Sequence, residues 1–138
     1  METAIKNDLL SYQVDEDGIG IITIDQINNP TNLFSPEFIQ NYLEIAQTAV
    51  ADNGVKGVIV TSARRMFMAG ADLNILESDI TNPAEFLQNM FEMHQNFRAI
   101  ETGGKPFVAA INGVALGGGM ELCLTCHHRI CVNDSKIK

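Results

Sequence analysis

The sequence has no long hydrophobic run and no start typical of an exported protein. No apolar stretch approaches the roughly 18 residues that a membrane-spanning helix requires. Residues 1–9 also lack the basic start and apolar segment of a secretory signal. We therefore expect no membrane span, and we expect the protein to work in the cytoplasm or an equivalent reducing space.

Basic residues are scarce. Nine Lys and Arg stand against seventeen Asp and Glu, which gives a formal net charge of −8. Proteins that hold the nucleic-acid backbone by releasing counterions need a basic surface. The charge therefore argues against a nucleic-acid partner. A small anionic ligand remains possible, since a few local basic side chains and backbone amides are enough to bind one.

Cysteines are few, odd in number and close together. The three thiols lie between Cys123 and Cys131, which does not fit a secreted disulfide framework. Cys123, Cys126 and His127 spell the C-x-x-C-H motif of c-type haem attachment, and His128 adds a potential metal ligand. Haem attachment requires export, and the first two thiols lie in an apolar predicted helix. We therefore predict buried thiols and no metal site.

Hydrophobic residues make up 46% of the 138 residues, which is enough for one domain with a folded core. β-branched runs alternate with amphipathic stretches, and this rhythm predicts an α/β domain. Helix starts are marked by Ser35-Pro36 and by Asn82-Pro83. The predicted strands are residues 9–14, 19–25, 55–61, 107–111 and 129–132, and the predicted helices begin at 36, 83 and 120 and end before 52, 103 and 127. The run at 55–61 is typical of a strand buried on both faces.

No repeat, linker or low-complexity segment interrupts this pattern. After the last predicted strand the sequence ends without a helix cap or a polar tail. We therefore expect the 138 residues to be less than a whole fold, truncated at the C-terminus.

Two loops with exposed glycines follow predicted strands, MAGAD at residues 68–72 and NGVALGGGMEL at residues 112–122. Strand ends are the usual binding sites of α/β proteins, and bare backbone N–H groups there could form an oxyanion hole. The alternative is a pair of tight turns. A phosphate loop is excluded, because Gly119-Met120 stands where Lys and Ser or Thr are needed. A dinucleotide fingerprint is excluded by Leu122 at the third glycine position.

Charged residues flank both loops. Glu121 follows the glycines early in a predicted helix. A carboxylate there could act as a general base, or it could simply be a first-turn glutamate stabilised by the helix dipole. Arg64 and Arg65 precede the first loop and would suit a phosphate group or a solvated turn. His94 is interpreted as a surface or boundary residue.

The sequence KPFVAAINGVALGGGMEL at residues 105–122 resembles, almost residue for residue, a signature of the crotonase family, whose members bind acyl-coenzyme A thioesters. FMAGADL at residues 67–73 resembles the family's other signature. NLFSPEF at residues 32–38 is most similar to the N-terminal hydratase part of multifunctional fatty-acid oxidation α chains. The resemblance implies an α/β fold built as a repeated β-β-α spiral, with residues 1–138 as the N-terminal portion of an enoyl-CoA hydratase domain.

The resemblance also implies catalytic residues. The backbone N–H groups of Ala71 and Gly118 would form the oxyanion hole for the thioester carbonyl. Glu121 matches one of two glutamates that hold and activate water in enoyl-CoA hydratases. The second glutamate, the proton donor, would lie past Lys138 in the family pattern, so we expect the 138-residue chain alone to be weakly active or inactive.

Substrate-binding residues follow from the same resemblance. The carbonyl of Ala69 matches the position that contacts the adenine ring, and Arg65 matches a basic position near the coenzyme phosphates. Gly70, Asp72 and Gly117 complete this set. Two departures from the family are Asn74, where many relatives carry a coenzyme-contacting lysine, and His127, where aspartate is usual.

The implied activity is hydration of 2-enoyl-CoA in fatty-acid β-oxidation. Coenzyme A is part of the substrate, so no separate cofactor is expected. Members of the family generally assemble as trimers or larger oligomers, so the resemblance also implies a homotrimer or a larger assembly. One alternative is a Δ3-Δ2-enoyl-CoA isomerase, which shares the oxyanion hole. Another is a noncatalytic module that binds acyl-CoA or serves assembly.

Overall fold

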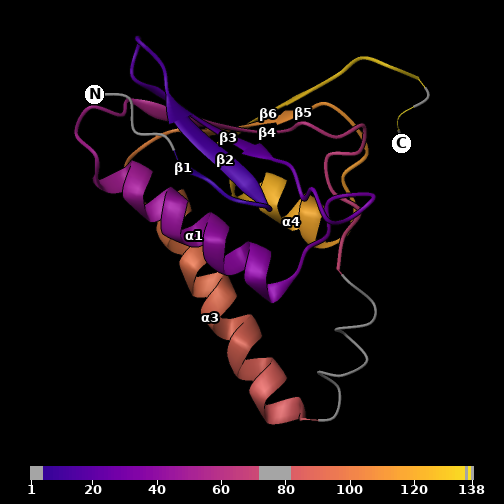
Figure 1. The fold of residues 1–138 in the computed structure, drawn as a ribbon. Helices are drawn as coiled ribbons and strands as arrows, with labels where there is room; N and C mark the ends of the chain where they lie inside the picture. The colour runs from indigo at the N-terminus through magenta and orange to yellow at the C-terminus, as the bar shows by residue number, and fades with distance from the viewer. Residues whose placement is uncertain (1–4, 72–81, 136, 138) are drawn as a thin grey trace.

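The computed structural model describes residues 5–71, 82–135 and 137. In chain order its elements are β1 (Ile5–Lys6), β2 (Leu10–Val14), β3 (Ile19–Ile24), α1 (Pro36–Ala51), β4 (Gly57–Ser62), α3 (Pro83–Glu101), β5 (Phe107–Ile111), α4 (Gly118–Thr125) and β6 (His128–Cys131). The strands form one sheet in sequential order, and the helices lie against one face of it (Figure 1).

The sheet changes from antiparallel to parallel at β3. β1 and β2 pair antiparallel, and the tight turn at residues 15–18 makes β2 and β3 antiparallel as well. The remaining pairs, from β3 with β4 to β5 with β6, are parallel. Parallel neighbours need a crossover connection, and each of these pairs is joined through a helix. The predicted β-α-β rhythm is confirmed.

Each crossover repeats one unit. A long strand is followed by a short segment that forms an isolated parallel bridge with another crossover, and then by a helix. The bridges join Phe34 to Ala71 and Met68 to Ala115. The order of strand, bridge segment and helix occurs around α1, α3 and α4, as the expected β-β-α repeat requires.

Local capping explains where the two long helices begin. The Ser35 hydroxyl accepts a hydrogen bond from the Phe38 N–H at 3.2 Å, and a proline occupies the first turn of α1. At α3, the Asn82 side chain donates to Glu85 at 2.9 Å and accepts from the Glu85 N–H. The second pair is a reciprocal capping arrangement, and both predicted helix starts are confirmed.

The core lies between the sheet and the helices. Alternate residues of β3, β4 and β5 face it, which matches the period of two in a strand. Its fully buried side chains include Ile22, Ile24, Phe38, Tyr42, Ala46, Val60, Phe107, Ala109 and Leu122. On the other face of the sheet, Ile59 and Thr61 are half-buried. The prediction that this strand is buried on both faces is wrong for the described residues, because their helices cover only one face.

Strand bounds differ from the predicted ones by one or two residues at β2, β3, β4 and β6, and most at β4, which spans Gly57–Ser62 instead of residues 55–61. β1 is a two-residue strand, too short to show a sequence period. α4 begins at Gly118 rather than at Met120, because Gly117 takes the cap position and the following glycines adopt helical backbone. β6 is shifted by one residue toward the N-terminus. Among the helices that the structure describes, none has the length and apolarity to cross a membrane.

Candidate functional site

Three loops meet at one edge of the sheet. They are residues 25–35, 63–71 and 112–117, and they follow the carboxyl ends of the parallel strands β3, β4 and β5. Because the carboxyl ends of neighbouring parallel strands lie at the same edge, loops distant in sequence become neighbours there. Both predicted glycine loops are in this group.

Backbone hydrogen bonds tie the loops together. The Phe34 N–H donates to the Gly70 carbonyl at 2.7 Å, and the Leu116 N–H donates to the Met68 carbonyl at 3.0 Å. The middle loop is therefore bonded on both sides, once to the loop after β3 and once to the loop after β5. This places the two signature segments side by side.

Buried Asn32 anchors the middle loop, residues 63–71, through hydrogen bonds of its side chain and its backbone. Its amide nitrogen donates to the Ser62 hydroxyl at 2.9 Å and to the Phe67 carbonyl at 3.0 Å, and its amide oxygen accepts from the Gln26 N–H at 3.1 Å. Its own backbone carbonyl accepts from the Ala69 N–H at 2.8 Å. Asn32 is fully buried, so these bonds replace water that the amide loses on folding.

A second amide performs the same task on the other side. Asn112 donates to the carbonyls of Ser62 and Arg64 at 3.0 and 2.9 Å. Sequence reasoning gave no role to Asn32 or Asn112. Asn112 had one visible signal, its place directly before Gly113 at the end of a strand. Asn32 had none beyond its place in the segment that resembles the family.

Two glycines allow the close approach of the loops. Gly70 and Gly117 have φ angles of +97° and +49°, in the left-handed region that favours glycine. A Cβ atom on Gly70 would lie 3.1 Å from the Leu116 carbonyl oxygen, and one on Gly117 would lie 3.7 Å from the Gly70 Cα. Glycine at these two positions therefore lets the two loops pack closely against each other.

The N–H groups of Ala71 and Gly118 follow these glycines. Gly118 is the first helical residue of α4, where N–H groups have no partner within the helix, and the helix has no side-chain cap. Within residues 5–71, 82–135 and 137, neither N–H donates a backbone hydrogen bond. Such backbone donors, one of them at the start of a helix, can stabilise negative charge on an oxygen atom.

Glu121 lies in the first turn of α4, and its N–H donates to the Gly117 carbonyl at 3.0 Å. The side chain is exposed and lines a hollow of about 290 Å³ between α4 and α3. Phe97, Leu124 and His94 also line this hollow. The structure therefore puts a carboxylate beside apolar side chains, one helical turn from the Gly118 N–H.

The two arginines have different surroundings. Arg64 forms an ion pair with Asp25, with 2.6 Å between Nε and Oδ1, and donates to the Gln26 carbonyl at 3.0 Å. It therefore joins two of the loops and is not free for a ligand. Arg65 is exposed at the same edge. Asp72 and Asn74 lie outside the described residues.

The cysteine motif is part of the core. Cys123 and Cys126 are buried, and burial raises the pKa values of their thiols to about 11 and about 12. His127 accepts a hydrogen bond from the Phe107 N–H at 3.0 Å through Nδ1, which connects the end of α4 to β5. The prediction of buried structural thiols is confirmed. His94 is exposed on α3, as predicted.

Comparison with known proteins shows which family this chain resembles. Residues 15–138 match the family model described as enoyl-CoA hydratase/isomerase. The fatty acid oxidation complex subunit alpha of Shewanella loihica is 37% identical over 123 residues, which are 88% of this chain and 17% of that subunit. The subunit of the same name from Idiomarina loihiensis is 36% identical over 132 residues, which are 91% of this chain and 18% of the subunit.

Solved structures show the same fold. An enoyl-CoA hydratase from Geobacillus kaustophilus superposes with a TM-score of 0.85 at 28% identity, over 95% of this chain and 48% of that one. An enoyl-CoA hydratase/isomerase (crotonase) described from Legionella pneumophila gives a TM-score of 0.82 at 26% identity, over 91% and 48% of the two chains. The chain thus spans about half the length of these proteins.

The predicted α/β crotonase-like fold is therefore confirmed, as the N-terminal portion of that fold. The predicted likeness to the hydratase part of fatty-acid oxidation α chains is confirmed as well. The family model covers most of the chain, and the paired loops and the start of α4 lie within the match. The chain belongs to the enoyl-CoA hydratase/isomerase family.

Proposed function

We propose that this chain forms part of an enoyl-CoA hydratase that adds water to 2-enoyl-CoA thioesters in fatty-acid oxidation. The observation that carries the proposal is the juxtaposition of two loops whose Ala71 and Gly118 N–H groups donate no backbone hydrogen bond to the described residues, with Glu121 one turn further along α4. The product is a 3-hydroxyacyl-CoA, so the reaction is that of a hydro-lyase.

The proposed oxyanion hole acts on the thioester carbonyl. As water adds at C3, electrons move from the double bond through C2 onto the carbonyl oxygen, which gains enolate character. Donors fixed before the reaction stabilise that charge without reorganising, and one such donor contributes about 3 kcal/mol to transition-state stabilisation. The N-terminal end of α4 adds its positive dipole end.

Glu121 is the proposed base. Its carboxylate takes a proton from water as the water oxygen bonds to C3, and a second acid delivers a proton to C2. The family resemblance implies that this acid is a second glutamate, at a position past Lys138 in the family pattern. The activity of the complete site is therefore proposed for the native protein that contains these residues.

Substrate recognition is proposed for the loop edge. The Ala69 carbonyl would accept from the adenine amino group, and exposed Arg65 would meet the coenzyme phosphates. Gly70, Asp72 and Gly117 would complete the contact. Coenzyme A is covalently part of this substrate, so the proposal needs no separate cofactor. We further propose a cytoplasmic protein that assembles as a homotrimer or a larger oligomer.

The test is the Glu121→Gln variant of the protein encoded by the native reading frame, assayed with crotonyl-CoA. Removing a general base lowers kcat by about 10²-fold or more, while binding of crotonyl-CoA should stay close to wild type. Glu101→Gln is a matched control, because Glu101 lines the same hollow. A Glu121→Gln protein with wild-type hydration would overturn the assignment.

The same variant separates the alternatives. An isomerase uses the oxyanion hole to stabilise the same enolate, so a variant that still shifts a Δ3 double bond to Δ2 but no longer hydrates would show both activities in one site. A noncatalytic module would bind crotonyl-CoA and turn over neither substrate in its wild-type form.

A further inference from the structure

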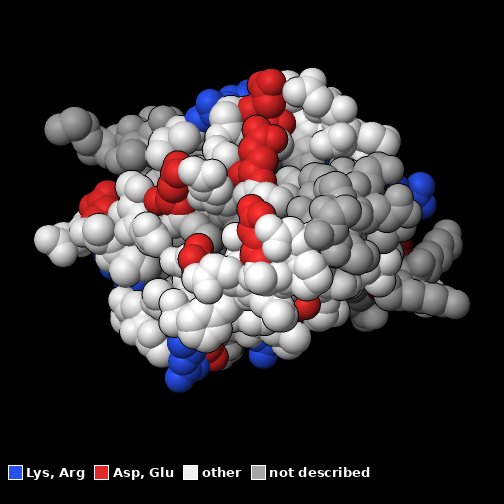
Figure 2. Space-filling model, turned by 90° about the horizontal axis from the view of Figure 1, so that it is seen from below, with Lys and Arg blue, Asp and Glu red and all other residues white. Residues whose placement is uncertain are grey.

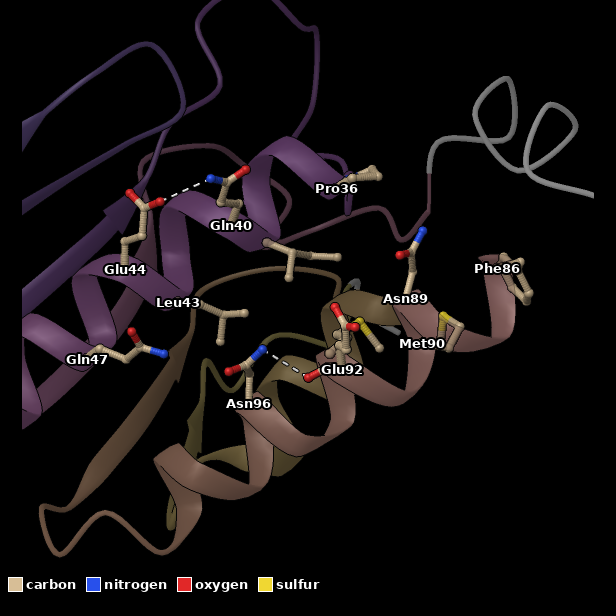
Figure 3. A pocket seen from close by; sticks show the side chains of 12 residues that line it. Pro36, Gln40, Leu43, Glu44, Gln47, Phe86, Asn89, Met90, Glu92 and Asn96 are labelled. Atoms are coloured by element: carbon tan, nitrogen blue, oxygen red, sulfur yellow. Dashed lines mark hydrogen bonds between the residues drawn. The ribbon is translucent and has the colours of Figure 1, made fainter. Parts of the chain in front are cut away.

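A groove separate from the three loops runs between α1 and α3. It has a volume of about 470 Å³ and is lined by residues 36–47 of α1 and 86–96 of α3. Figure 3 shows the two helices side by side with Leu43 of α1 pointing toward α3. None of the residues in the three loops lines it. We call it the α1–α3 groove.

The floor of the groove is apolar. Ile39 and Leu43 of α1 and Met90 and Met93 of α3 line it. Ile39 and Met90 are half-buried and pack against the hydrophobic core, which holds the floor of the groove in place. Methionine side chains adapt to different apolar partners, which suits a surface that receives another molecule.

The rim of the groove is polar and acidic. Gln40 and Glu44 stand on the α1 side, and Asn89, Glu92 and Asn96 stand on the α3 side. Glu44 and Glu92 each accept a hydrogen bond from a glutamine one turn earlier, at 3.1 and 2.7 Å. No Lys or Arg is among the residues that line the groove in the described structure. Two carboxylates therefore face it without a basic neighbour in its lining.

The surface around the α1–α3 groove is negatively charged, like its rim. Acidic side chains gather across the face that carries the helices, and basic ones lie near its margin (Figure 2). The whole chain carries a formal net charge of −8. A partner that covers this face must therefore bring positive charge together with apolar side chains.

We propose that the α1–α3 groove binds a basic amphipathic helix of a partner protein. Its apolar residues, spaced by three and four, would enter between Leu43 and Met90, and its Lys or Arg residues would meet Glu44 and Glu92 on opposite rims. About eleven residues of lining helix span roughly 16 Å, the length of three helical turns. An apolar helix face laid into a groove between charged rims is an established mode of recognition.

Charge also argues against the other occupants. A second copy of this chain docked through this same face would place acidic helix on acidic helix, and like charges facing one another weaken association. A small anionic ligand would meet the same repulsion. The occupant with complementary chemistry is a basic helix.

The probe is a fluorescent peptide of about 15 residues made of Leu and Lys, with Leu at three- and four-residue steps. Its binding to the native protein is measured by fluorescence anisotropy. The Glu44→Lys/Glu92→Lys variant should bind it about tenfold more weakly, because two attractions become repulsions. Met90→Ser should also weaken binding, since it removes part of the apolar floor.

The matched control is Glu16→Lys/Asp17→Lys, which changes net charge equally at the turn between β2 and β3, away from the groove. This control should bind like wild type. Equal loss in both double variants would show unspecific attraction to an acidic protein and overturn the proposal. Two other results would also overturn the proposal. One is that the peptide does not bind. The other is that Glu44→Lys/Glu92→Lys dissociates the native oligomer, because a second copy would then occupy the groove.

Discussion

At the scale of single residues, Gly118 has no room for a side chain. A Cβ atom there would lie 2.4 Å from two ring carbons of Phe34, the residue whose N–H is bonded to Gly70. The Phe34 ring is held by packing against the rings of Phe38 and Phe97, with centroids 6.2 Å apart in each pair. Steric fit at one position therefore connects α4 to the other signature loop.

The Gly118→Ala variant should lower the free energy of unfolding by about 1–3 kcal/mol, the usual cost of overpacking. Chemical denaturation measures it. Gly54→Ala is the control, because its new Cβ would meet only the Asp52 carboxylate at 3.2 Å. Equal effects of the two substitutions would contradict the steric account. The Gly118→Ala protein should also bind crotonyl-CoA more weakly than Gly54→Ala.

For single residues, prediction from the sequence succeeded where the residue types of the local segment determine burial. Cys123 and Cys126 are buried as predicted, because an apolar helix buries small thiols. Arg64 shows the limit of such reasoning. Its ion pair with Asp25 joins two loops that are far apart in sequence, and a local sequence pattern cannot predict a contact of that kind.

At the scale of elements, α4 and its C-cap residue carry the thiols whose ionisation opposes folding. Burial raises the pKa values of Cys123 and Cys126 from 9.0 to about 11 and about 12, so the folded state holds these protons more tightly than the unfolded chain. Stability is therefore unaffected by the two thiols below pH 9.0 and falls as the pH rises toward 11.

Urea unfolding measured from below pH 9.0 to about pH 11 should show this decline. Near pH 10 the loss attributable to Cys126 should be roughly 1 kcal/mol. Cys126→Ala should flatten the slope in part, since buried Tyr42, whose pKa burial also raises, keeps its own contribution. Cys131→Ala, which alters an exposed thiol, should change the slope less, because Cys131 raises the pKa of Cys123 only as a smaller contribution beside burial. The account fails if both variants behave alike.

Elements were predictable where caps and periods are local. Ser35-Pro36 and Asn82-Pro83 mark the starts of α1 and α3 because the bonds that cap them join residues three apart. The start of α4 was missed because glycine carries no helix signal. Gly118 and Gly119 are helical because of packing, and a Cβ on Gly119 would lie 2.7 Å from that of Met68.

At the scale of the whole molecule, the site exists only through topology. Periodicity predicted the strands that end at one edge, and both glycine loops could be named from the sequence. Their mutual contact depends on the order of parallel strands and on bridges such as Phe34 with Ala71, which join residues far apart in the chain. The roles proposed for Ala71, Gly118 and Glu121 rest on the family resemblance, because a backbone N–H leaves no trace in composition.

The central claim is that the Ala71 and Gly118 N–H groups polarise a thioester carbonyl. Isotope-edited infrared difference spectroscopy of carbonyl-labelled crotonyl-CoA bound to the native protein tests it without turnover. The account predicts that the carbonyl stretch moves to lower frequency on binding, and that Gly118→Pro, which removes one N–H, reduces the shift more than Gly118→Ala, which adds a Cβ but keeps the N–H. A bound thioester whose carbonyl stretch stays at its value in water would contradict the account.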